Sequence, residues 1–189
     1  MTFTIPDRLE RILVWPLLIY RRLRCGYPYR RIPLSQGKFA IVDPDDYYRL
    51  NIHKWFVSKV GHTYYARRHI RTNGGLKKTT VCMHRAIMNA PDHLLVDHIN
   101  HNGLDNRKVN LRLATKAQNS RNTRKTTKKT RSRYKGIYYH KQNKCWYARI
   151  TANGITFPIG SFKDEIAAAK AYDRAAKKYH GKFAGLNFP

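Results

Sequence analysis

The residues of this chain that could do chemistry are the adjacent Asp97 and His98, followed by Asn110 and Asn119. Hydrolysis of a phosphodiester needs a divalent metal to stabilise charge on the phosphate and a base to activate water. The carboxylate of Asp97 is a hard oxygen ligand suited to Mg²⁺. His98, whose ordinary pKa is about 6.5, can accept a proton near neutral pH. The pair therefore predicts chemistry directed at phosphodiesters.

Two short strands and a loop are expected to hold this pair. Residues 94–96 are apolar and predict a strand that leads into the pair. Residues 100–107 are rich in Asn, Asp and Gly and predict a hairpin loop. Residues 110–113 should then return as the second strand.

A helix is predicted directly after the second strand. Thr115 and Gln118 have the spacing of a capping box, so the helix should begin with Thr115 as its cap. Asn119 would lie in the first helical turn, facing back toward the hairpin. The order strand, hairpin, strand and helix is therefore expected to bring Asp97, His98 and Asn119 together.

Residues 94–122 resemble the ββα-metal motif of the HNH endonucleases in spacing and order. The resemblance implies that His98 is the general base, that Asn110 fixes the hairpin and orients the base, and that Asn119 is a metal ligand with Asp97. Asn119 stands where the family name has its last His, a departure shared by the subgroup of phage and intron homing nucleases. It favours one hard cation, Mg²⁺ or Mn²⁺, over zinc. The alternative, turn and cap residues only, does not predict all four positions.

The charge of the chain indicates a polyanionic partner. Lys and Arg number 38 against 11 Asp and Glu, which gives a formal net charge of +27 at pH 7. From residue 106 to residue 163 there are sixteen Lys or Arg and no carboxylate. Double-stranded DNA is the expected partner and no small-molecule substrate is expected, although basic charge alone also suits RNA and membrane surfaces.

An N-terminal helix is predicted within residues 1–31. Residues 9–23 combine apolar side chains with arginines at both ends and read as an amphipathic or buried helix, interrupted or kinked near Pro16. Its apolar run of about ten residues is too short to span a bilayer, and a small-residue cleavage site is missing. Packing on the body of the protein is expected first. Membrane contact is not the expected role of this helix, and peripheral membrane contact and a dimer contact stay open as alternatives.

The cysteines point to a reducing compartment. Cys25, Cys82 and Cys145 are too far apart for a zinc knuckle, and an odd number does not suit a disulfide framework. We therefore expect a reducing cytoplasm, and the resemblance to phage-type HNH nucleases implies that of a bacterial or phage-infected cell. The oligomeric state is left open.

A small α+β unit is predicted ahead of the motif. The expected elements are a strand at 39–42, a helix at 44–55, paired strands at 56–60 and 62–70, a turn at 73–75 and a strand at 79–83. This order is similar to the region before the nuclease motif in phage-type HNH proteins. His84, at a strand-to-helix junction, is a candidate catalytic residue, but a structural hydrogen bond is the commoner role of such a histidine.

A polar, basic segment follows the motif. Residues 120–133 lack apolar anchors and predict a linker that is flexible when free and ordered along phosphates when bound. Arg121 and Arg124 are its candidate DNA contacts. A merely solvated tether is the alternative.

The C-terminal third predicts a sheet and one helix. Residues 134–139, 144–150 and 156–162 read as three short strands. Residues 166–180 form an Ala-rich helical pattern that begins after two acidic residues and stops at Gly181.

Residues 134–189 resemble the Apetala/ethylene-response-factor (AP-two) DNA-binding domain. The shared motifs are Tyr-x-Gly-Ile, Trp-x-Ala-x-Ile, Ile-Gly-x-Phe, Ala-Ala-x-Ala-Tyr-Asp-x-Ala-Ala and the ending Gly-x-x-Ala-x-Leu-Asn-Phe-Pro. The resemblance implies a three-stranded sheet that lies in the major groove and reads bases. The implied DNA-facing residues are Lys135, Tyr138, His140, Lys144, Trp146, Arg149 and Thr151. For Trp146 a place in the core is nearly as good an interpretation.

Departures from the plant pattern leave the target sequence open. Tyr138 and Arg149 replace the residue types usual in plant factors, and Thr156 and Pro158 stand where an Arg and an aromatic are common.

Together these signals predict an α+β protein: a ββα-metal nuclease module followed by a three-stranded antiparallel sheet packed on one C-terminal helix. The expected segments are 1–31, the nuclease domain 32–122, the basic linker 123–133 and the DNA-binding domain 134–189. The predicted function is a metal-dependent DNA endonuclease targeted by its C-terminal domain. A non-cleaving DNA-binding regulator on a nuclease scaffold is the first alternative, and a membrane-associated protein is the second.

Overall fold

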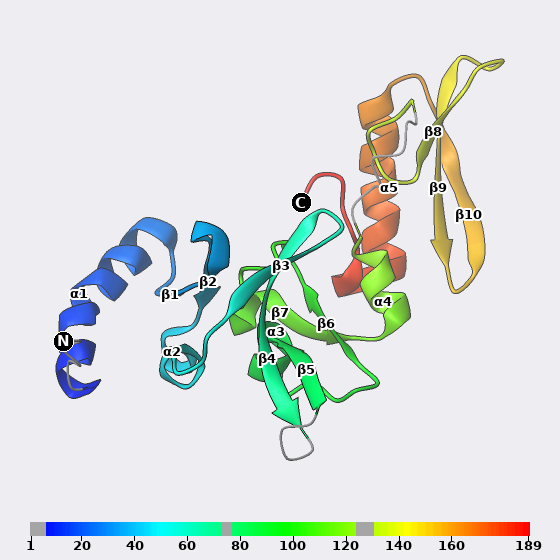
Figure 1. Cartoon of the computed structure of the whole chain (residues 1–189). Helices are drawn as coiled ribbons and strands as arrows, with labels where there is room; N and C mark the ends of the chain where they lie inside the picture. Colours follow the sequence, from blue (N-terminus) through cyan, green and yellow to red (C-terminus); the bar gives the residue numbers. More distant parts are fainter. Residues whose placement is uncertain (1–6, 73–76, 124–130) are drawn as a thin grey trace. The chain divides into compact units, whose positions relative to one another are not determined.

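The computed structural model describes residues 7–72, 77–123 and 131–189, with side chains from residue 12 onward. The chain divides into two compact units, Met1–Leu113 and Ala114–Pro189 (Figure 1). Each unit has its own cluster of buried apolar side chains. Helices and antiparallel strands occur in both, which confirms the α+β prediction.

The first unit begins with helix α1 and a two-stranded sheet. Helix α1 (Asp7–Cys25) has Pro16 inside it and is not interrupted there, while the alternative prediction of a kink stays a prediction. Strands β1 (Arg30–Pro33) and β2 (Phe39–Val42) pair antiparallel and are followed by helix α2 (Pro44–Asn51).

Helix α1 leaves its apolar side chains in solvent. Ile12, Leu13, Trp15 and Leu23 are between 66% and 81% exposed, so the expected packing of this helix on the body of the protein is not seen. Within the part of the chain that the structure describes, no helix has both the length and the apolar character that crossing a bilayer requires.

A three-stranded sheet and a short helix complete the core of this unit. Strands β3 (Phe56–Val60), β4 (Thr63–Thr72) and β5 (Lys77–Cys82) form an antiparallel sheet in the order β3-β4-β5, and helix α3 (Met83–Met88) follows at once. The turn predicted at 73–75 lies outside the described residues. The most deeply buried apolar side chains of the core are Ile32, Ala40, Val42, Leu50, Ala66 and Met83.

The strand-hairpin-strand-helix order of the motif is confirmed. Strands β6 (Leu95–His98) and β7 (Leu111–Ala114) pair, and helix α4 (Lys116–Arg121) begins after Thr115. The capping box is present: Gln118 N donates to Thr115 Oγ1 at 3.2 Å, and Thr115 N donates to Gln118 Oε1 at 2.8 Å.

The second unit is a three-stranded sheet packed on a helix, as predicted. Strands β8 (Ile137–His140), β9 (Cys145–Ala152) and β10 (Ile155–Phe162) form an antiparallel sheet in the order β10-β9-β8, and helix α5 (Glu165–His180) is drawn beside it in orange to red (Figure 1). Asp164 caps this helix by accepting from Ala167 N at 2.7 Å.

Small residues let helix α5 approach the sheet closely. Ala168, Ala169 and Ala176 have no exposed surface and pack in one core with Ala148 and Ile150 of β9. At the end of the helix, His180 Nε2 lies 3.1 Å from the carbonyl oxygen of Thr151, which ties α5 to β9 a second time. The inward face of the sheet therefore packs against the helix.

Helix α4 is packed with the second unit. Lys135 Nζ donates to the carbonyl oxygens of Arg121 at 2.7 Å and Thr123 at 2.9 Å, and Arg121 Nη2 donates to Asn153 Oδ1 at 3.1 Å. The motif assigns α4 to the nuclease domain, whereas these contacts and the compact units group it with the sheet. The segment boundaries 32–122, 123–133 and 134–189 stay a prediction.

Gly136 should be essential to the second unit. Its φ is +76°, and a Cβ there would collide with the ring of the buried Tyr172. Gly154 has a similar φ of +81° but open space around it, so Gly154→Ala is a matched control that meets backbone strain alone. We expect Gly136→Ala to lower the thermal unfolding midpoint, followed by circular dichroism, clearly more than Gly154→Ala. Equal shifts would mean that Tyr172 moves aside without cost.

Candidate active site and nucleic-acid interface

His98 is the last residue of β6 and is buried. Its Nε2 lies 3.3 Å from Oδ1 of Asn106, a side chain with no exposed surface. Burial lowers the pKa of His98, while the bond to Asn106 and the nearby carboxylates of Asp97 and Asp105 raise it in part. The imidazole is therefore neutral near pH 7 and can accept a proton.

Two other rings surround His98. The centroid of His84 lies 5.1 Å from it at an interplanar angle of 85°, and that of Tyr65 lies 5.9 Å away. Burial, followed by the charges of His98, Arg85 and Arg67, lowers the pKa of His84 to about 3. His84 is thus a neutral ring that packs edge-on against the candidate base. Its part in the chemistry stays a prediction.

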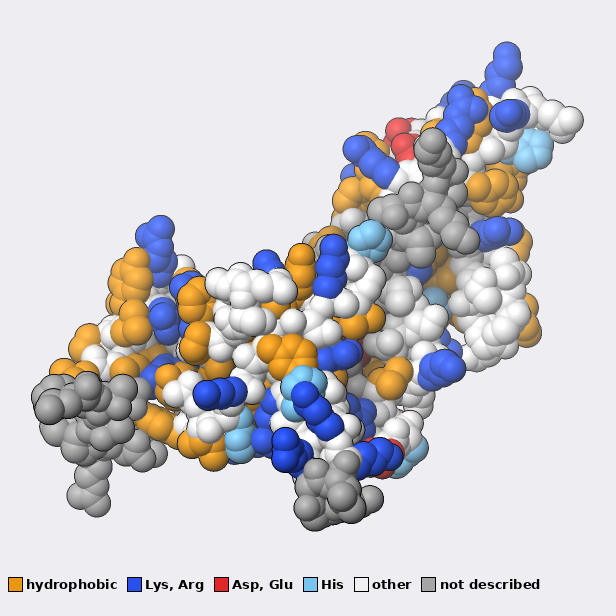
Figure 2. Space-filling model, in the orientation of Figure 1, with side chains coloured by type: hydrophobic (Ala, Val, Ile, Leu, Met, Phe, Trp, Pro, Cys, Tyr) orange, Lys and Arg blue, Asp and Glu red, His pale blue; other side chains and the backbone are white. Residues whose placement is uncertain are grey.

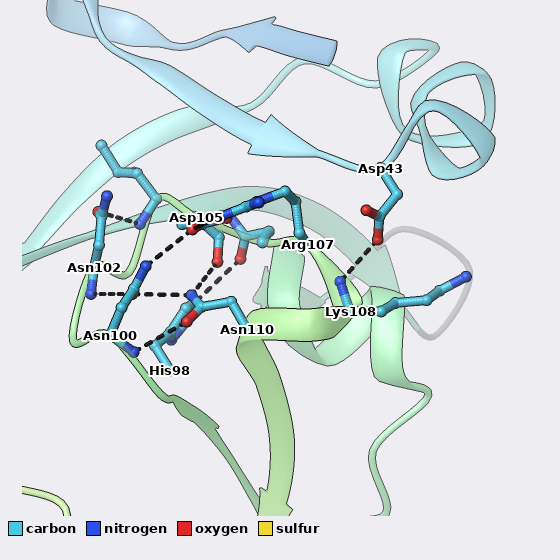
Figure 3. Close-up of polar contacts among 10 residues, drawn as sticks. Asp43, His98, Asn100, Asn102, Asp105, Arg107, Lys108 and Asn110 are labelled. Atoms are coloured by element: carbon cyan, nitrogen blue, oxygen red, sulfur yellow. Dashed lines mark hydrogen bonds and ion pairs between the residues drawn. The ribbon is translucent and has the colours of Figure 1, made fainter. Parts of the chain in front are cut away.

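Asn110 joins the two ends of the loop between β6 and β7 (Figure 3). Its Oδ1 accepts from Asn100 N at 3.0 Å, and its Nδ2 donates to Asn100 Oδ1 at 3.0 Å and to the carbonyl oxygen of Asp105 at 2.8 Å. Its own carbonyl accepts from Ile99 N at 2.9 Å. Through these contacts Asn110 can hold the hairpin in place. Its predicted second role, orienting His98, stays a prediction.

A buried ion pair lies inside the same loop. Arg107 binds both carboxylate oxygens of Asp105, Nε to Oδ1 at 2.7 Å and Nη2 to Oδ2 at 2.6 Å. Asn100 Nδ2 donates to Asp105 Oδ2 at 2.9 Å, and the guanidinium of Arg107 stacks 3.5 Å over the ring of Tyr27. Because these bonds to the carboxylate of Asp105 are charge-assisted, they strongly favour this conformation of the loop.

The loop is also attached to the first sheet and to α2. Asn106 N donates to the carbonyl oxygen of Ile41 at 2.7 Å, and Lys108 N donates to Asp43 Oδ2 at 2.8 Å. Gly103 packs so tightly that a Cβ would collide with the backbone of β4 and lie 2.8 Å from the ring of Tyr65. The loop therefore positions the ring of Tyr65 as well as Asn106, both of which contact His98.

Asp97, the predicted metal ligand, is engaged by Arg112 of β7. Arg112 Nε and Nη2 both donate to Asp97 Oδ2, at 2.8 Å and 2.6 Å. Within residues 7–72, 77–123 and 131–189 there is no group of three or more His, Cys, Asp or Glu that could hold a metal ion. One carboxylate can still serve Mg²⁺, which keeps several waters and takes substrate phosphate oxygens.

The structure places Asn119 and Arg121 but does not describe Arg124. Asn119 is half-buried in the first turn of α4, in the second unit, and its role as a metal ligand stays a prediction from its sequence position. Arg121 contacts Asn153, as described above. Arg124 lies outside the described residues.

The outward face of the second sheet carries aromatic and basic side chains. Strand alternation places Tyr138 and His140 of β8 beside Tyr147, Arg149 and Thr151 of β9, opposite the core face. Tyr138 and Tyr147 stack with centroids 5.6 Å apart, and the guanidinium of Arg149 lies 5.1 Å from the centre of the Tyr138 ring. This face offers stacking surfaces and donors to a nucleic acid.

Two residues predicted to face DNA have structural contacts, and their contact with DNA stays a prediction. Trp146 lies on the core side of β9, against Tyr139 at 4.9 Å and the cluster under α5, a place that favours the core interpretation. The ammonium of Lys135 is held by the backbone around α4, and burial lowers its pKa. Lys144 is exposed at the turn between β8 and β9, where its φ is +48°.

Basic side chains spread over the surface in Figure 2, with few acidic ones on the visible face. From residue 47 to residue 91, through the whole of the β3-β4-β5 sheet, the chain carries nine Lys or Arg and no carboxylate. Arg71, Lys77 and Lys78 are exposed members of this set. A surface of one sign at this density suits a phosphate backbone.

Several residues of these sites are absent from the sequence-based prediction. Asn106, Arg112 and Tyr65 contact His98 or Asp97, and sequence spacing gives no sign of those contacts. Tyr147 could have been identified, because side chains alternate between the two faces of a strand. Trp146 shares a face with the buried Ala148, whereas Tyr147 shares the opposite face with the exposed Arg149.

Comparisons with known proteins agree on two relationships. The HNH endonuclease family model matches residues 89–121. The chain is 33% identical over 155 residues to an uncharacterized HNH endonuclease of Acanthamoeba polyphaga mimivirus. The matched region covers 81% of this chain and 76% of the relative. It is 34% identical over 94 residues to Protein 3.8 of Escherichia phage T7, covering 50% of this chain and 76% of that protein.

The second relationship is to plant proteins. The chain is 47% identical over 58 residues to an AP2/ERF and B3 domain-containing protein of Oryza sativa subsp. japonica, which covers 31% of this chain and 16% of the plant protein. Both resemblances inferred from the sequence are thus confirmed. The similarity to the plant protein extends over 58 residues, about the length of one small domain.

Removing Asn110 should loosen the loop. Asn110→Ala leaves the buried carbonyl of Asp105 and the side chain of Asn100 short of partners, at a cost of about 1–3 kcal/mol. We expect a lower urea midpoint for unfolding of the first unit. Asn102→Ala is the matched control, because Asn102 is exposed in the same loop and its side chain accepts a local bond from Leu104 N. Equal losses for both variants would contradict a special role for Asn110.

Proposed function

The chain belongs to the HNH endonuclease family and is a nuclease, and from this premise we propose that it hydrolyses phosphodiester bonds of double-stranded DNA with His98 as general base. The observation that carries the proposal is the buried, neutral imidazole of His98, held by Asn106 next to Asp97. We place the chain with the homing-type members, because Asn119 replaces the last His. The cytoplasm of a bacterial or phage-infected cell suits its three free cysteines.

The proton path follows from the contact with Asn106. When Asn106 Oδ1 accepts from Nε2 of His98, the neutral ring carries its lone pair on Nδ1. That nitrogen takes the proton of a water whose oxygen attacks phosphorus. A new P–O bond forms, the ester P–O bond breaks, and the leaving oxygen takes up a proton from solvent. His84 and Tyr65 keep the imidazole in a poorly solvated setting.

Mg²⁺ or Mn²⁺ is the proposed cofactor, and Asp97 would be its carboxylate ligand. The hard oxygen donor of Asp97 fits such a cation, and one carboxylate together with water and phosphate oxygens suffices for Mg²⁺. The family motif assigns Asn119 as the second ligand, and that assignment rests on sequence position. When bound, the cation stabilises negative charge on the phosphate and the leaving oxygen.

We propose that the sheet of the second unit holds and reads the duplex. Its outward face presents Tyr138, Tyr147 and Arg149 as one stacked cluster, with His140 and Thr151 on the same side. The plant relative that matches a domain of this size is named for its AP2/ERF domain. Two modest binding units on one chain gain from effective concentration, so neither needs high affinity alone.

A non-cleaving DNA-binding regulator is the second candidate, and the ion pair between Asp97 and Arg112 is the observation that favours it. Arg112 binds Oδ2 of Asp97 with two donors, and a carboxylate neutralised in this way is a weaker ligand for a cation. Cleavage of duplex DNA in Mg²⁺ that stops in EDTA decides between the two functions.

His98→Ala should reduce cleavage by about 10²-fold or more, the usual contribution of a general base, and leave DNA affinity nearly unchanged. His93→Ala is the matched control, because His93 is exposed five residues earlier in the chain. Cleavage is measured on plasmid DNA with Mg²⁺, and affinity by fluorescence anisotropy in EDTA. A parallel loss of affinity would make His98 structural.

Arg149→Ala should weaken binding to the preferred duplex by about 1–3 kcal/mol and relax preference at one base pair, as direct base readout does. Arg174→Ala removes the same charge from an exposed position on α5 and should change affinity much less. Both are compared by anisotropy across a set of single-base variants of the preferred site. Uniform weakening on every sequence would instead identify Arg149 as a phosphate contact.

A further inference from the structure

We propose that Arg112 acts as a competitor for Asp97, so that a divalent cation binds at Asp97 only together with DNA. The inference rests on the proposed function, in which Asp97 is the cation ligand. It goes further by assigning a role to Arg112 and an order to the assembly of the site: the free protein keeps the carboxylate neutralised, and the nucleic acid releases it.

The ion pair is built to hold. Nε and Nη2 of Arg112 converge on one oxygen of Asp97, at 2.8 Å and 2.6 Å, and the two side chains are only 12% and 7% exposed. Charge-assisted bonds of this length are the strong class of hydrogen bond, and partial burial reduces their screening by water and salt. The two residues lie on the paired strands β6 and β7, so the backbone keeps them in reach of each other.

A cation that approaches the free protein finds little to bind. Asp105, the next carboxylate along the chain, is already held by Arg107 and Asn100. Among the described residues no cluster of three His, Cys, Asp or Glu offers another site. The cation must therefore displace the guanidinium of Arg112 from Asp97 or share the carboxylate with it. Two positive groups on one carboxylate repel each other.

DNA changes both sides of this competition. A phosphate supplies oxygen ligands for the cation, and two of its oxygens can also bind the planar guanidinium of Arg112 in place of Asp97. Each effect makes cation binding easier when DNA is present. Because binding free energies are reciprocal, the cation should strengthen DNA binding by the same factor.

The experiment uses the full chain and Mn²⁺ as the probe, with free Mn²⁺ measured by electron paramagnetic resonance. Without DNA, the unmodified protein should bind Mn²⁺ no more tightly than Asp97→Asn, because Asp97 is occupied. Arg112→Gln should bind Mn²⁺ about tenfold more tightly or better, within the usual range for coupled sites. Arg112→Lys, which keeps the positive charge, should stay near the unmodified protein, and Asp97→Asn added to Arg112→Gln should abolish the gain.

A second measurement needs no change at Arg112, in case Arg112→Gln fails to fold. In a His98→Ala background, chosen because it should cut DNA about 10²-fold more slowly or less, Mn²⁺ binding is compared with and without Asp97→Asn, in the presence and absence of a short duplex. The duplex contributes equally to both proteins. We expect an Asp97-dependent increment of bound Mn²⁺ with the duplex and none without it.

The outcomes separate this inference from the function on which it rests. Asp97-dependent Mn²⁺ binding of equal strength with and without DNA would overturn the role of Arg112 and leave the metal assignment standing. An unchanged or weaker Mn²⁺ affinity of folded Arg112→Gln would do the same and make Arg112 a structural partner. No Asp97-dependent binding in either condition would overturn both the competition and the proposed metal ligand.

Discussion

The carboxylate of Asp105 is the group on which the geometry of the candidate site depends. It accepts bonds from Arg107 and Asn100, while its main-chain carbonyl accepts from Asn110. A buried carboxylate is tolerated only when its bonds are satisfied, so these partners must all be in place at once. The connection 99–110 between β6 and β7 is rich in polar residues and would otherwise have many conformations, but it is thereby restricted to one.

The setting of His98 follows from that restriction. The loop brings Asn106 to Nε2 of the imidazole, and Gly103 lies against the ring of Tyr65. Tyr65 and His84 then pack against the imidazole and reduce its exposure to bulk water. Burial outweighs the nearby carboxylates and lowers the pKa of His98, so the base is neutral where the chemistry needs it. The sequence shows only that a histidine follows an aspartate, whereas the fold sets its protonation state.

What the sequence could predict was local. The capping box at Thr115, the hairpin and the three C-terminal strands each follow from residues a few positions apart, and all are present. The partner of Asp97 could not be found in this way, because Arg112 is fifteen residues away and the pairing depends on how β6 meets β7. Trp146 shows a different limit: its motif suggested DNA, while strand alternation, applied consistently, already assigned it to the core.

The few acidic residues are largely used inside the protein, and this shapes its outer charge. Asp46, Asp97, Asp105 and Asp173 are buried, and each accepts from a cation or from backbone N–H groups. Asp43 and Asp164 likewise accept bonds from backbone N–H groups. These carboxylates bind groups of the loop, the helix ends and the C-terminal tail. Few carboxylates therefore remain at the surface to offset the exposed Lys and Arg. Folding therefore gives a chain of basic composition a surface that is basic as well. The carboxylates that order the candidate site lie inside the protein, so the electrostatic field outside it attracts a polyanion.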